Sequence, residues 1–417
     1  MTEWVGLLDC NNFFVSCERL FRPDLKTRPV LVLSSNDGCV VARSQEIKDK
    51  GIAMGVPYFQ IKDILKDIDA TMFSSHFALY RDVSRRVFEV MRKEVDTVEQ
   101  YSVDEAFFTL KGSIDEVSEK VRAIKDRVEM EVGIPVSVGV ALSKTQSKYA
   151  SSVAKKAGGI CVLSQTDWHD RTPAILLSSI WGVGQRSAEA YRKHGLLTVA
   201  DLIKLERRQV TGLFGVVGER LWQELQGIPS GTLSRRLEHQ KSILNSRSFR
   251  ETTNDISVLK DAVASHVREA AEDLRSMDLK ASFIQVYLGT SRHGDFFLQG
   301  GSDRTTFSEP TDDSFLLLKA AMSLVDGIYS SGVPYKKAGI LLTDFTPNTE
   351  EQLSMFSDST EAKTASLMPV IDALNRNMGR DSIVLGSRLQ SRKWQSSRES
   401  KSPAYTTDWS ELKTVIA

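Results

Sequence analysis

The chain has 417 residues, of which 41% are hydrophobic and 26% charged, and its 54 basic side chains balance its 54 acidic ones. This length allows about two to four domains with cores of their own, and the composition is that of a globular protein. Net charge therefore indicates no class of partner. The four cysteines are scattered, which argues against a disulfide framework or a zinc site and favours a reducing cytoplasm. Neither a signal peptide nor a membrane-spanning segment is predicted.

Hydrophobic periodicity predicts alternating strands and helices in the first part of the chain. A buried strand ends abruptly at Asp9, and two helical patterns at 77–95 and 117–128 flank a hairpin that carries Asp104 and Glu105. The other predicted elements are strands at 29–33, 39–42 and 136–142, a turn at 34–38 and a helix at about 44–50. This order is a split βαβ layout, so we expect the strand-end acids to cluster on one face of an antiparallel sheet.

Asp9, Asp104 and Glu105 are of the residue types that hard divalent cations prefer. Two such ions, roughly 3.5 to 4 Å apart, can activate an attacking hydroxyl and neutralise a leaving oxygen in nucleotidyl transfer. Taken singly, an acid at a hairpin tip or at the start of a turn is more often structural. Their joint placement favours a site for two metal ions. Phe13 and Phe14 would ordinarily be core aromatics, but one of them must point towards whatever Asp9 binds.

A stretch without acids follows from residue 132 to residue 166, although it contains Lys144, Lys148, Lys155 and Lys156. On a helix, the first three of these lysines return to nearly the same angle and form a cationic ridge. A solvated lysine face is the ordinary explanation of such a run. The lack of counter-charges in the same stretch favours anion binding instead.

Residues 171–240 change to short helices, and Gly182 and Gly184 form a turn just before Arg186. Such a turn is typical of a helix-hairpin-helix, in which backbone N–H groups approach a phosphate without reading sequence. A plain interhelical turn is the alternative. Residues 181–250 contain 12 Lys or Arg against 6 Asp or Glu, and this basic context favours DNA binding.

A second split layout is predicted for residues 241–345, without an acidic hairpin. Its expected elements are strands near 242–250, 282–290, 304–308 and 337–345, and helices at 257–275 and 312–330. We interpret it as a DNA-binding domain, and a structural α+β module with ordinary surface charge explains it equally well. The side chains available for phosphates are Arg247, Arg250, Lys280, Arg292 and Arg304.

The chain becomes polar after Pro347 and then contains a short run with apolar anchors, namely Gln352, Leu353, Ser354, Met355 and Phe356. Such a run suits an extended peptide that docks in a partner's groove, and a local packing turn is the alternative. One more short helix is predicted at about 367–374. Trp394, Tyr405 and Trp409 indicate that the basic, serine-rich tail does more than keep the chain soluble.

Together, the motifs LLDCNNFFVSCE, YSVDEAF, SVGVALSKTQSKYAS and WGVG resemble those of Y-family translesion DNA polymerases. FRPDL, SNDGCVVAR, SSHFALY and SRSF resemble the bacterial UmuC type, the catalytic subunit of DNA polymerase V. The resemblance covers essentially the whole chain. It implies an α+β right-hand polymerase with a split βαβ (ferredoxin-like) palm, small fingers, a helix-hairpin-helix thumb and a second α+β little-finger domain. The implied domains are a palm at 1–13 and 77–170, fingers at 14–76, a thumb at 171–240, a little finger at 241–345 and a partner-binding tail at 346–417.

The resemblance also implies site residues. Asp9, Asp104, Glu105 and the Cys10 carbonyl match ligands of two Mg²⁺ ions, and Phe14 matches the steric gate that excludes a ribose 2′-OH. The implied triphosphate contacts are Phe13, Phe14, Arg43, Lys48 and Lys155. The expected DNA contacts are Lys144, Lys148, Gly182, Gly184, Arg186, Arg247 and Arg250. Many relatives carry a Tyr and an Arg where this chain has Gln45 and Lys48. Lys48 keeps the positive charge but not the two-pronged hydrogen bonding of a guanidinium.

The implied function is low-fidelity, template-directed translesion synthesis in the SOS response to DNA damage, without a proofreading exonuclease. The implied partners are primer-template DNA, dNTPs, a sliding clamp at 352–356, a UmuD-type accessory dimer and a RecA-type recombinase, in the cytoplasm at the nucleoid. A catalytically silent DNA-bound scaffold is one alternative, against which the three intact acids argue. A nucleotide cyclase could share the palm and metals, but it would leave the helix-hairpin-helix without a purpose.

Overall fold

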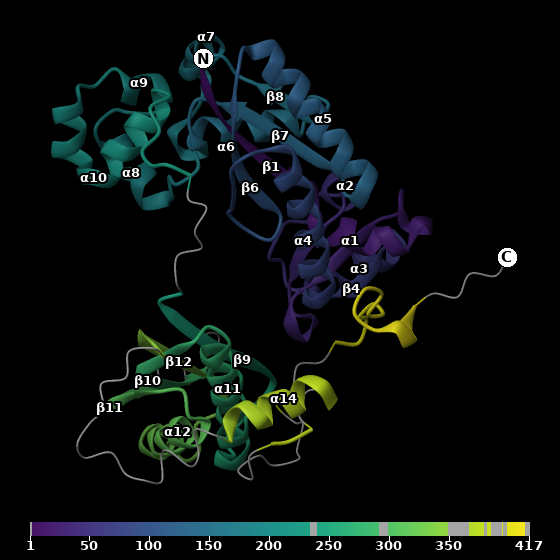
Figure 1. Cartoon of the computed structure of the whole chain (residues 1–417), viewed down its shortest axis with the longest axis vertical. Helices are drawn as coiled ribbons and strands as arrows, with labels where there is room; N and C mark the ends of the chain where they lie inside the picture. Colours follow the sequence, from purple (N-terminus) through teal and green to yellow (C-terminus); the bar gives the residue numbers. More distant parts are fainter. Residues whose placement is uncertain are drawn as a thin grey trace. The chain divides into compact units, whose positions relative to one another are not determined.

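The computed structural model describes residues 2–233, 240–291, 299–348, 367–378, 382–384, 394 and 398–412. The chain forms two compact units, one of residues 1–237 together with 398–417 and one of residues 238–397 (Figure 1). In the part of the chain that the structure describes, no helix is long and apolar enough to cross a lipid bilayer.

A five-stranded sheet forms the centre of the first unit. Strand β1 (Glu3–Cys10) lies in its middle, antiparallel to β6 (Glu105–Lys111) and β7 (Val136–Ala141). Strands β5 (Val98–Gln100) and β8 (Ile160–Val162) complete the order β5-β6-β1-β7-β8. The strand that was predicted to end at Asp9 therefore extends one residue further and pairs on both sides, which explains why its apolar residues are buried.

Side chains alternate along β1, so the two faces of this sheet differ. Leu8 and Phe108 join the main core with α4 (Phe77–Glu94) and α5 (Ile114–Val132), and both helices were predicted. Helix α6 (Lys144–Ala154) packs against β7 and β1. A Cβ added at Gly139 would lie 1.9 Å from the backbone nitrogen of Ser151, so only glycine permits this close approach. Asp9 and Glu105 line a cavity together with residues of this helix.

A three-stranded sheet with the order β3-β2-β4 forms a small second core in the same unit. The elements between residues 13 and 74 are α1 (Phe13–Phe21), η1 (Pro23–Leu25), β2 (Val30–Leu33), η2 (Ser35–Asp37), β3 (Val40–Arg43), α2 (Gln45–Asp49), α3 (Tyr58–Asp67) and β4 (Thr71–Ser74). Of these, α1 and η1 bury their apolar side chains in the main core instead. The predicted strands and the predicted short helix are confirmed here. Among the strands of this sheet, β4 pairs with β2 alone, which leaves it at the sheet edge.

Short helices follow, as predicted for residues 171–240. They are α7 (Gln165–Arg171), η3 (Thr172–Ala174), η4 (Leu177–Ser179), α8 (Gln185–Lys193), α9 (Val199–Ile203) and α10 (Arg207–Leu225). They pack around Trp168, whose indole Nε1 donates a hydrogen bond of 2.7 Å to the Leu225 carbonyl. The buried Glu224 carboxylate accepts from the backbone nitrogen of Thr145 at 3.0 Å, so the start of α6 is fastened to the end of α10.

The second unit is an α+β layout with an antiparallel sheet in the order β11-β10-β12-β9, and the predicted second split layout is confirmed. Its elements are β9 (Ser242–Thr253), α11 (Ile256–Ser276), β10 (Leu279–Thr290), β11 (Gly301–Thr311), α12 (Ser314–Ile328), β12 (Tyr335–Pro347) and α14 (Met368–Met378). Arg275 holds α14 through a two-pronged ion pair with Asp372, at 2.6 and 2.9 Å.

The predicted tail at 346–417 contains residues of both units. Trp394 is buried in the core of the second unit, and Tyr405 is buried in the main core of the first. Trp409, in η6 (Trp409–Glu411), is 90% exposed. The predicted clamp-binding run at 352–356 lies outside the described residues. The predicted domain boundaries stay predictions.

Candidate active site

Asp9 and Glu105 face each other directly across the β1–β6 pair, although they are far apart in the sequence. Both line a cavity of about 310 Å³ between the five-stranded sheet, α6 and the start of the helical region. The other residues that line it are Leu7, Thr145, Lys148, Tyr149, Ser151, Ser152, Lys155, Ser179, Ile180 and Trp181. The two carboxylates thus occupy an open polar site, because the antiparallel register places both strand-end acids on the α6 face.

The electrostatics of this pair differ between its members. Burial, and then a side-chain hydrogen bond with Glu105, raises the pKa of Asp9 to about 7, against the opposing charge of Lys155. Burial acts to raise the pKa of Glu105 as well, but hydrogen bonds from Asp9 and Lys148 outweigh it and lower that pKa. Asp9 therefore takes up a proton as the pH falls through about 7, because two carboxylates that face each other resist ionising together.

Every lysine of the predicted ridge faces a carboxylate from the five-stranded sheet. The Lys144 Nζ donates to Glu99 at 2.6 Å, and the Lys148 Nζ donates to both oxygens of Glu105 at 2.6 Å. The Lys155 Nζ donates to Asp9 at 2.7 Å. The counter-charges that are absent from residues 132–166 are therefore supplied by β1, β5 and β6. No local sequence pattern indicates Glu99 as a partner of Lys144, because the two residues meet only when the sheet forms.

Asp104 is placed differently from the other two acids. Its carboxylate accepts a hydrogen bond of 2.5 Å from the Ser102 hydroxyl, and its carbonyl accepts from the backbone nitrogen of Cys10 at 2.8 Å. The described residues contain no group of three or more His, Cys, Asp or Glu side chains that could hold a metal ion. The structure thus brings Asp9 and Glu105 together and leaves the Asp104 side chain on Ser102.

This donor set still fits a magnesium ion. Mg²⁺ typically takes one or two carboxylates and completes its coordination with water and substrate phosphates rather than with an all-protein cage. Asp9 and Glu105 are two adjacent carboxylates in an open cavity, and a divalent cation can displace the two ammonium groups and the proton that they bind without it. The assignment of three carboxylate ligands and two ions stays a prediction.

Phe14, rather than Phe13, is the aromatic side chain at the surface of α1. Phe13 is buried in the main core, whereas Phe14 is half-buried and stacks on Tyr80, with ring centroids 4.5 Å apart and an interplanar angle of 14°. Phe77 meets Phe14 edge-on at 5.9 Å. Asn12 precedes the helix and has a left-handed backbone conformation, with φ of 49°. The chain therefore turns sharply between Asp9 and the two phenylalanines of α1. Tyr80 is a supporting residue that the sequence patterns did not indicate.

Of the cationic side chains expected at the triphosphate, Lys155 contacts Asp9 and the charge of Asp9 also acts on Lys48. The Lys48 Nζ donates to the Asn12 side chain at 2.5 Å. Burial lowers the pKa of Lys48, and the nearby charges of Arg43 and Lys155 lower it further. The Arg43 guanidinium bonds the Ile52 carbonyl. These contacts place three cations within electrostatic reach of one another.

Gln45 does not join this group in the structure. Its side-chain nitrogen donates to Asp49 at 2.7 Å, one turn further along the exposed face of α2. This contact stabilises the short helix locally, in the manner of other i, i+4 pairs. Lys48 is therefore the side chain of α2 that approaches Asp9.

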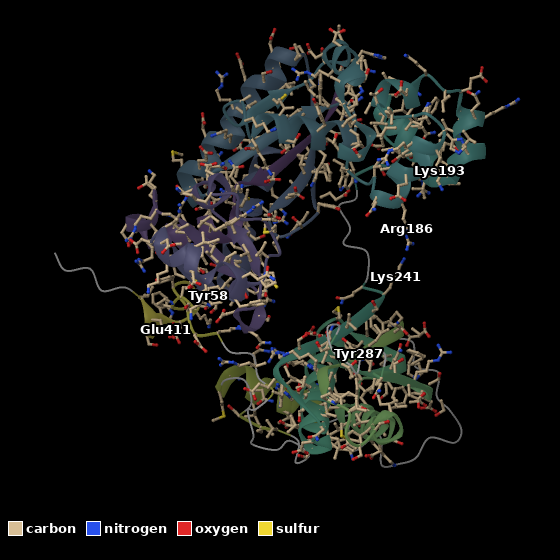
Figure 2. All side chains as sticks on the ribbon, turned by 180° about the vertical axis from the view of Figure 1, so that it is seen from behind. Tyr58, Arg186, Lys193, Lys241, Tyr287 and Glu411 are labelled. Carbon is tan, nitrogen blue, oxygen red and sulfur yellow. The ribbon has the colours of Figure 1, made fainter. Side chains whose placement is uncertain are left out.

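The glycine turn before α8 is open. Gly182 has a φ of 86°, which favours glycine, and a Cβ added at Gly182 or Gly184 would meet no atom within 4 Å. Arg186 is exposed in the first turn of α8 and projects from the ribbon (Figure 2). Trp181 packs edge-on against Tyr101 at 5.5 Å and lies under the Lys148 ammonium, so this turn begins at the wall of the active-site cavity.

In the second unit, the predicted phosphate contacts Arg247 and Arg250 lie on β9, whereas Lys280 lies on β10 and Arg304 on β11. The Arg247 guanidinium lies over the Trp394 ring, 5.5 Å from its centroid. Arg250 is exposed, and its carbonyl accepts a hydrogen bond of 2.7 Å from the Lys336 Nζ. Lys337 lies over the ring of Tyr287 on the neighbouring strands, and Figure 2 labels this tyrosine. Arg292 lies outside the described residues.

Comparisons with known proteins agree along nearly the entire chain. Residues 8–152 match the impB/mucB/samB family, residues 240–355 match its C-terminal domain, and residues 365–415 match a domain of unknown function named DUF4113. The chain is 38% identical to protein UmuC of Salmonella typhimurium, over 98% of this chain and 99% of that protein. It is 26% identical to DNA polymerase IV of Bacillus velezensis, over 92% of each chain.

Solved structures show the same fold. A Y-family DNA polymerase chimera of Dbh and Dpo4 aligns with a TM-score of 0.69 and 20% identity, covering 83% of this chain and all of that one. An insertion ternary complex of Dbh DNA polymerase aligns with a TM-score of 0.55 and 19% identity, over the same shares. The predicted α+β right-hand fold is thereby confirmed.

Proposed function

The chain belongs to the impB/mucB/samB family, and from this membership we propose that it is a template-directed DNA polymerase of the Y family. It copies past damaged bases with low fidelity in the SOS response and lacks a proofreading exonuclease. The observation that carries the proposal is the cavity in which Asp9 and Glu105 meet beside Lys148 and Lys155. Such a site joins acids for divalent metal to cations for phosphate, which nucleotidyl transfer requires.

Asp9 and Glu105 of this cavity, together with their neighbours in the chain, the Cys10 carbonyl and Asp104, would hold two Mg²⁺ ions. When bound, these ions supply activation of the primer 3′-OH and neutralisation of the leaving pyrophosphate.

Other side chains would bind and select the nucleotide. Lys155, Lys48 and Arg43 attract the triphosphate, because Lys155 contacts Asp9 and the charges of Arg43 and Lys155 both act on Lys48. Phe14 presents its ring at the surface of α1, where it excludes the 2′-OH of a ribonucleotide. Phe13 anchors the same helix in the core.

Primer-template DNA is the macromolecular substrate in this proposal. Gly182 and Gly184 leave space beside the turn for a phosphate, and Arg186 adds charge at the same turn. Arg247 and Arg250 would contact the DNA backbone from the second unit. The resemblance adds a sliding clamp at 352–356, a UmuD-type accessory dimer and a RecA-type recombinase as partners. A cytoplasmic location at the nucleoid follows from this function.

The test is single-nucleotide extension of a primed template by the full chain. We expect D9N, E105Q and D104A each to lower the extension rate by about 100-fold or more, because they remove charge that acts on the reacting phosphate. The matched control is E99Q, which breaks the equivalent ion pair with Lys144 outside the cavity lining. It should keep the rate within about threefold. Retained extension in D9N and E105Q would overturn the proposal, and retained extension in D104A alone would remove only the third ligand.

A further inference from the structure

The segment of residues 398–412 returns to the first unit after the chain has built the second. It lies beside β4, where Figure 1 shows it in yellow. Ser74 forms a parallel bridge with Lys401, its backbone nitrogen donates to the Ser400 carbonyl at 3.0 Å, and its hydroxyl accepts from the Ser400 nitrogen at 3.1 Å. The segment therefore pairs with the exposed edge of the three-stranded sheet, which an unpartnered edge strand favours.

The same segment also enters the main core. Tyr405 is buried and stacks on Phe21 of α1, with ring centroids 4.5 Å apart and an interplanar angle of 12°. Ser402 is only 5% exposed. In contrast, Trp409 and Ser410 further along the segment are exposed. Two side chains of the segment are thus built into the unit that contains the active site.

Ser402 reaches a buried acid. Its hydroxyl donates to the Glu18 Oε1 at 3.1 Å, and the Tyr80 hydroxyl donates to the same oxygen at 2.6 Å. The His76 Nδ1 lies 3.1 Å from the Ser402 oxygen. A serine hydroxyl has one hydrogen, which here goes to Glu18, so the histidine nitrogen must be the donor in that contact. The polar contacts run from His76 through Ser402 to Glu18, where Tyr80 joins them.

Glu18 depends strongly on these two hydroxyls. It is 0% exposed, and its Oε2 has no hydrogen-bond partner among the described residues. Burial also raises its pKa. A buried polar group that loses a partner is costly, so removal of either hydroxyl will shift Glu18 or the side chain that remains bonded to it.

Tyr80 connects Glu18 to the proposed nucleotide site. Its hydroxyl is held by Glu18, and its ring is the surface on which Phe14 stacks. Steric exclusion of a single hydroxyl group is sensitive to small displacements of the excluding ring. If Tyr80 moves, the Phe14 ring gains room to move as well.

We propose that Ser402 is a positioning residue for sugar selection: through Glu18 it fixes Tyr80, and Tyr80 supports the Phe14 ring. This inference rests on the proposed function, in which Phe14 excludes ribonucleotides. It gives the segment 398–412, which belongs to a domain of unknown function, a role in substrate choice. Residues close to the end of the chain then determine how strictly the polymerase rejects a 2′-OH.

The experiment compares kcat/KM for a dNTP with kcat/KM for the matching rNTP, in primer extension by the full chain. We expect S402A and Y80F each to lower the dNTP-to-rNTP ratio about fivefold, the effect of losing one net hydrogen bond. S402T restores a hydroxyl and should restore most of the ratio. The matched control is S410A, which alters an exposed serine of the same segment that bonds only to Asp408 nearby.

The double variant S402A/Y80F separates positioning from a general loss of structure. If Ser402 acts through Glu18 on Tyr80, the double variant will reject ribonucleotides no worse than Y80F does, whereas independent effects would multiply. A ratio in S402A within twofold of the original chain, or multiplied effects in the double variant, would overturn the inference. Should S402A fail to fold, S402C keeps the volume with a weak donor and should show the same loss.

The variant F14A distinguishes this inference from the proposed function. If F14A accepts ribonucleotides and S402A does not change selection, only the positioning role fails. If F14A leaves the ratio unchanged, the gate assignment itself is wrong. Absence of extension by the unaltered chain would count against the proposed polymerase activity and not specifically against Ser402.

Discussion

Asp9 shows at the scale of one residue how a binding site differs from an ordinary ion pair. It is buried beside another carboxylate, and burial of two like charges is unfavourable unless a proton or a cation balances them. Lys155 and Lys148 supply part of that balance, and the proton on Asp9 supplies more. A divalent cation would replace this proton and these ammonium groups, so the arrangement suits metal binding.

Metal binding should therefore release a proton from Asp9. Its pKa of about 7 lies above the usual value for an aspartate, so the acid form dominates below pH 7 and competes with the metal. We expect affinity for Mn²⁺, used as a probe, to fall by about tenfold from pH 8 to pH 6. Calorimetry in buffers of different ionisation enthalpy should show about one proton released at pH 6 and little at pH 8. Equal release at both values, or an unchanged profile in D9N, would contradict this.

Sugar selection is the second prediction at this scale. Replacing Phe14 by alanine removes the ring that we propose faces the sugar, and we expect the preference for dNTP over rNTP to fall by about 10- to 100-fold. The matched control is F77A, because Phe77 touches Phe14 edge-on and is 42% exposed. Single-nucleotide kinetics measure both variants. An equal loss of selection in F77A would show that general packing, rather than the Phe14 ring, sets the preference.

The acids of the site could be predicted from the sequence because a strand that stops at Asp9 and a hairpin with Glu105 are local patterns. Their lysine partners could not, because Lys155 lies 146 residues from Asp9 and Lys148 lies 43 residues from Glu105. Nor could the Ser102 contact of Asp104, which depends on the conformation of the loop between β5 and β6. Local patterns predicted which residues are reactive, and the fold determines how their charges are paired.

At the scale of elements, α6 decides where the cations of the site lie. It begins with a Ser143 cap, packs directly on the sheet at Gly139 and carries Lys148 towards Glu105. Its helical periodicity was readable from the sequence, and the structure confirms the helix. Its direction was not readable, because it is set by contact with β7 and by the Glu224 carboxylate at its first turn.

Gly139 allows that contact, so G139A should displace α6. The added methyl group would meet the backbone of Ser151 at 1.9 Å, and backbone atoms cannot rotate away as a side chain can. We expect the free energy of unfolding to fall by about 3 kcal/mol or more, at the upper end of the cost of overpacking. Urea unfolding followed by circular dichroism measures it.

The same change at Gly212 is the control. Gly212 lies within α10, and a Cβ there would meet no atom within 4 Å. Alanine in an open helical position should raise stability by about 0.5 to 1 kcal/mol. A loss in G139A no larger than the change in G212A would contradict the close packing of α6 on β7.

At the scale of the whole molecule, the order of the sequence and the order of the structure differ. The tail was interpreted as a partner-binding region after the last domain, since its composition is polar and its aromatic residues are isolated. In the structure, Trp394 belongs to the core of the second unit and Tyr405, only a few residues later, to the core of the first. Composition could not predict this, because each aromatic is buried by residues that are distant in the sequence.

Calorimetry of the full chain can test this division. Two compact units with separate cores should unfold in two transitions. The variant V138A, in β7, should lower the transition of the first unit, and I284A, in β10, that of the second, which assigns each transition to its unit. Removing a buried aromatic costs about 3 to 5 kcal/mol. We therefore expect W394A to lower only the transition that I284A lowers, and Y405A to lower only the transition that V138A lowers. A tail that packed as one piece would move the same transition in both variants.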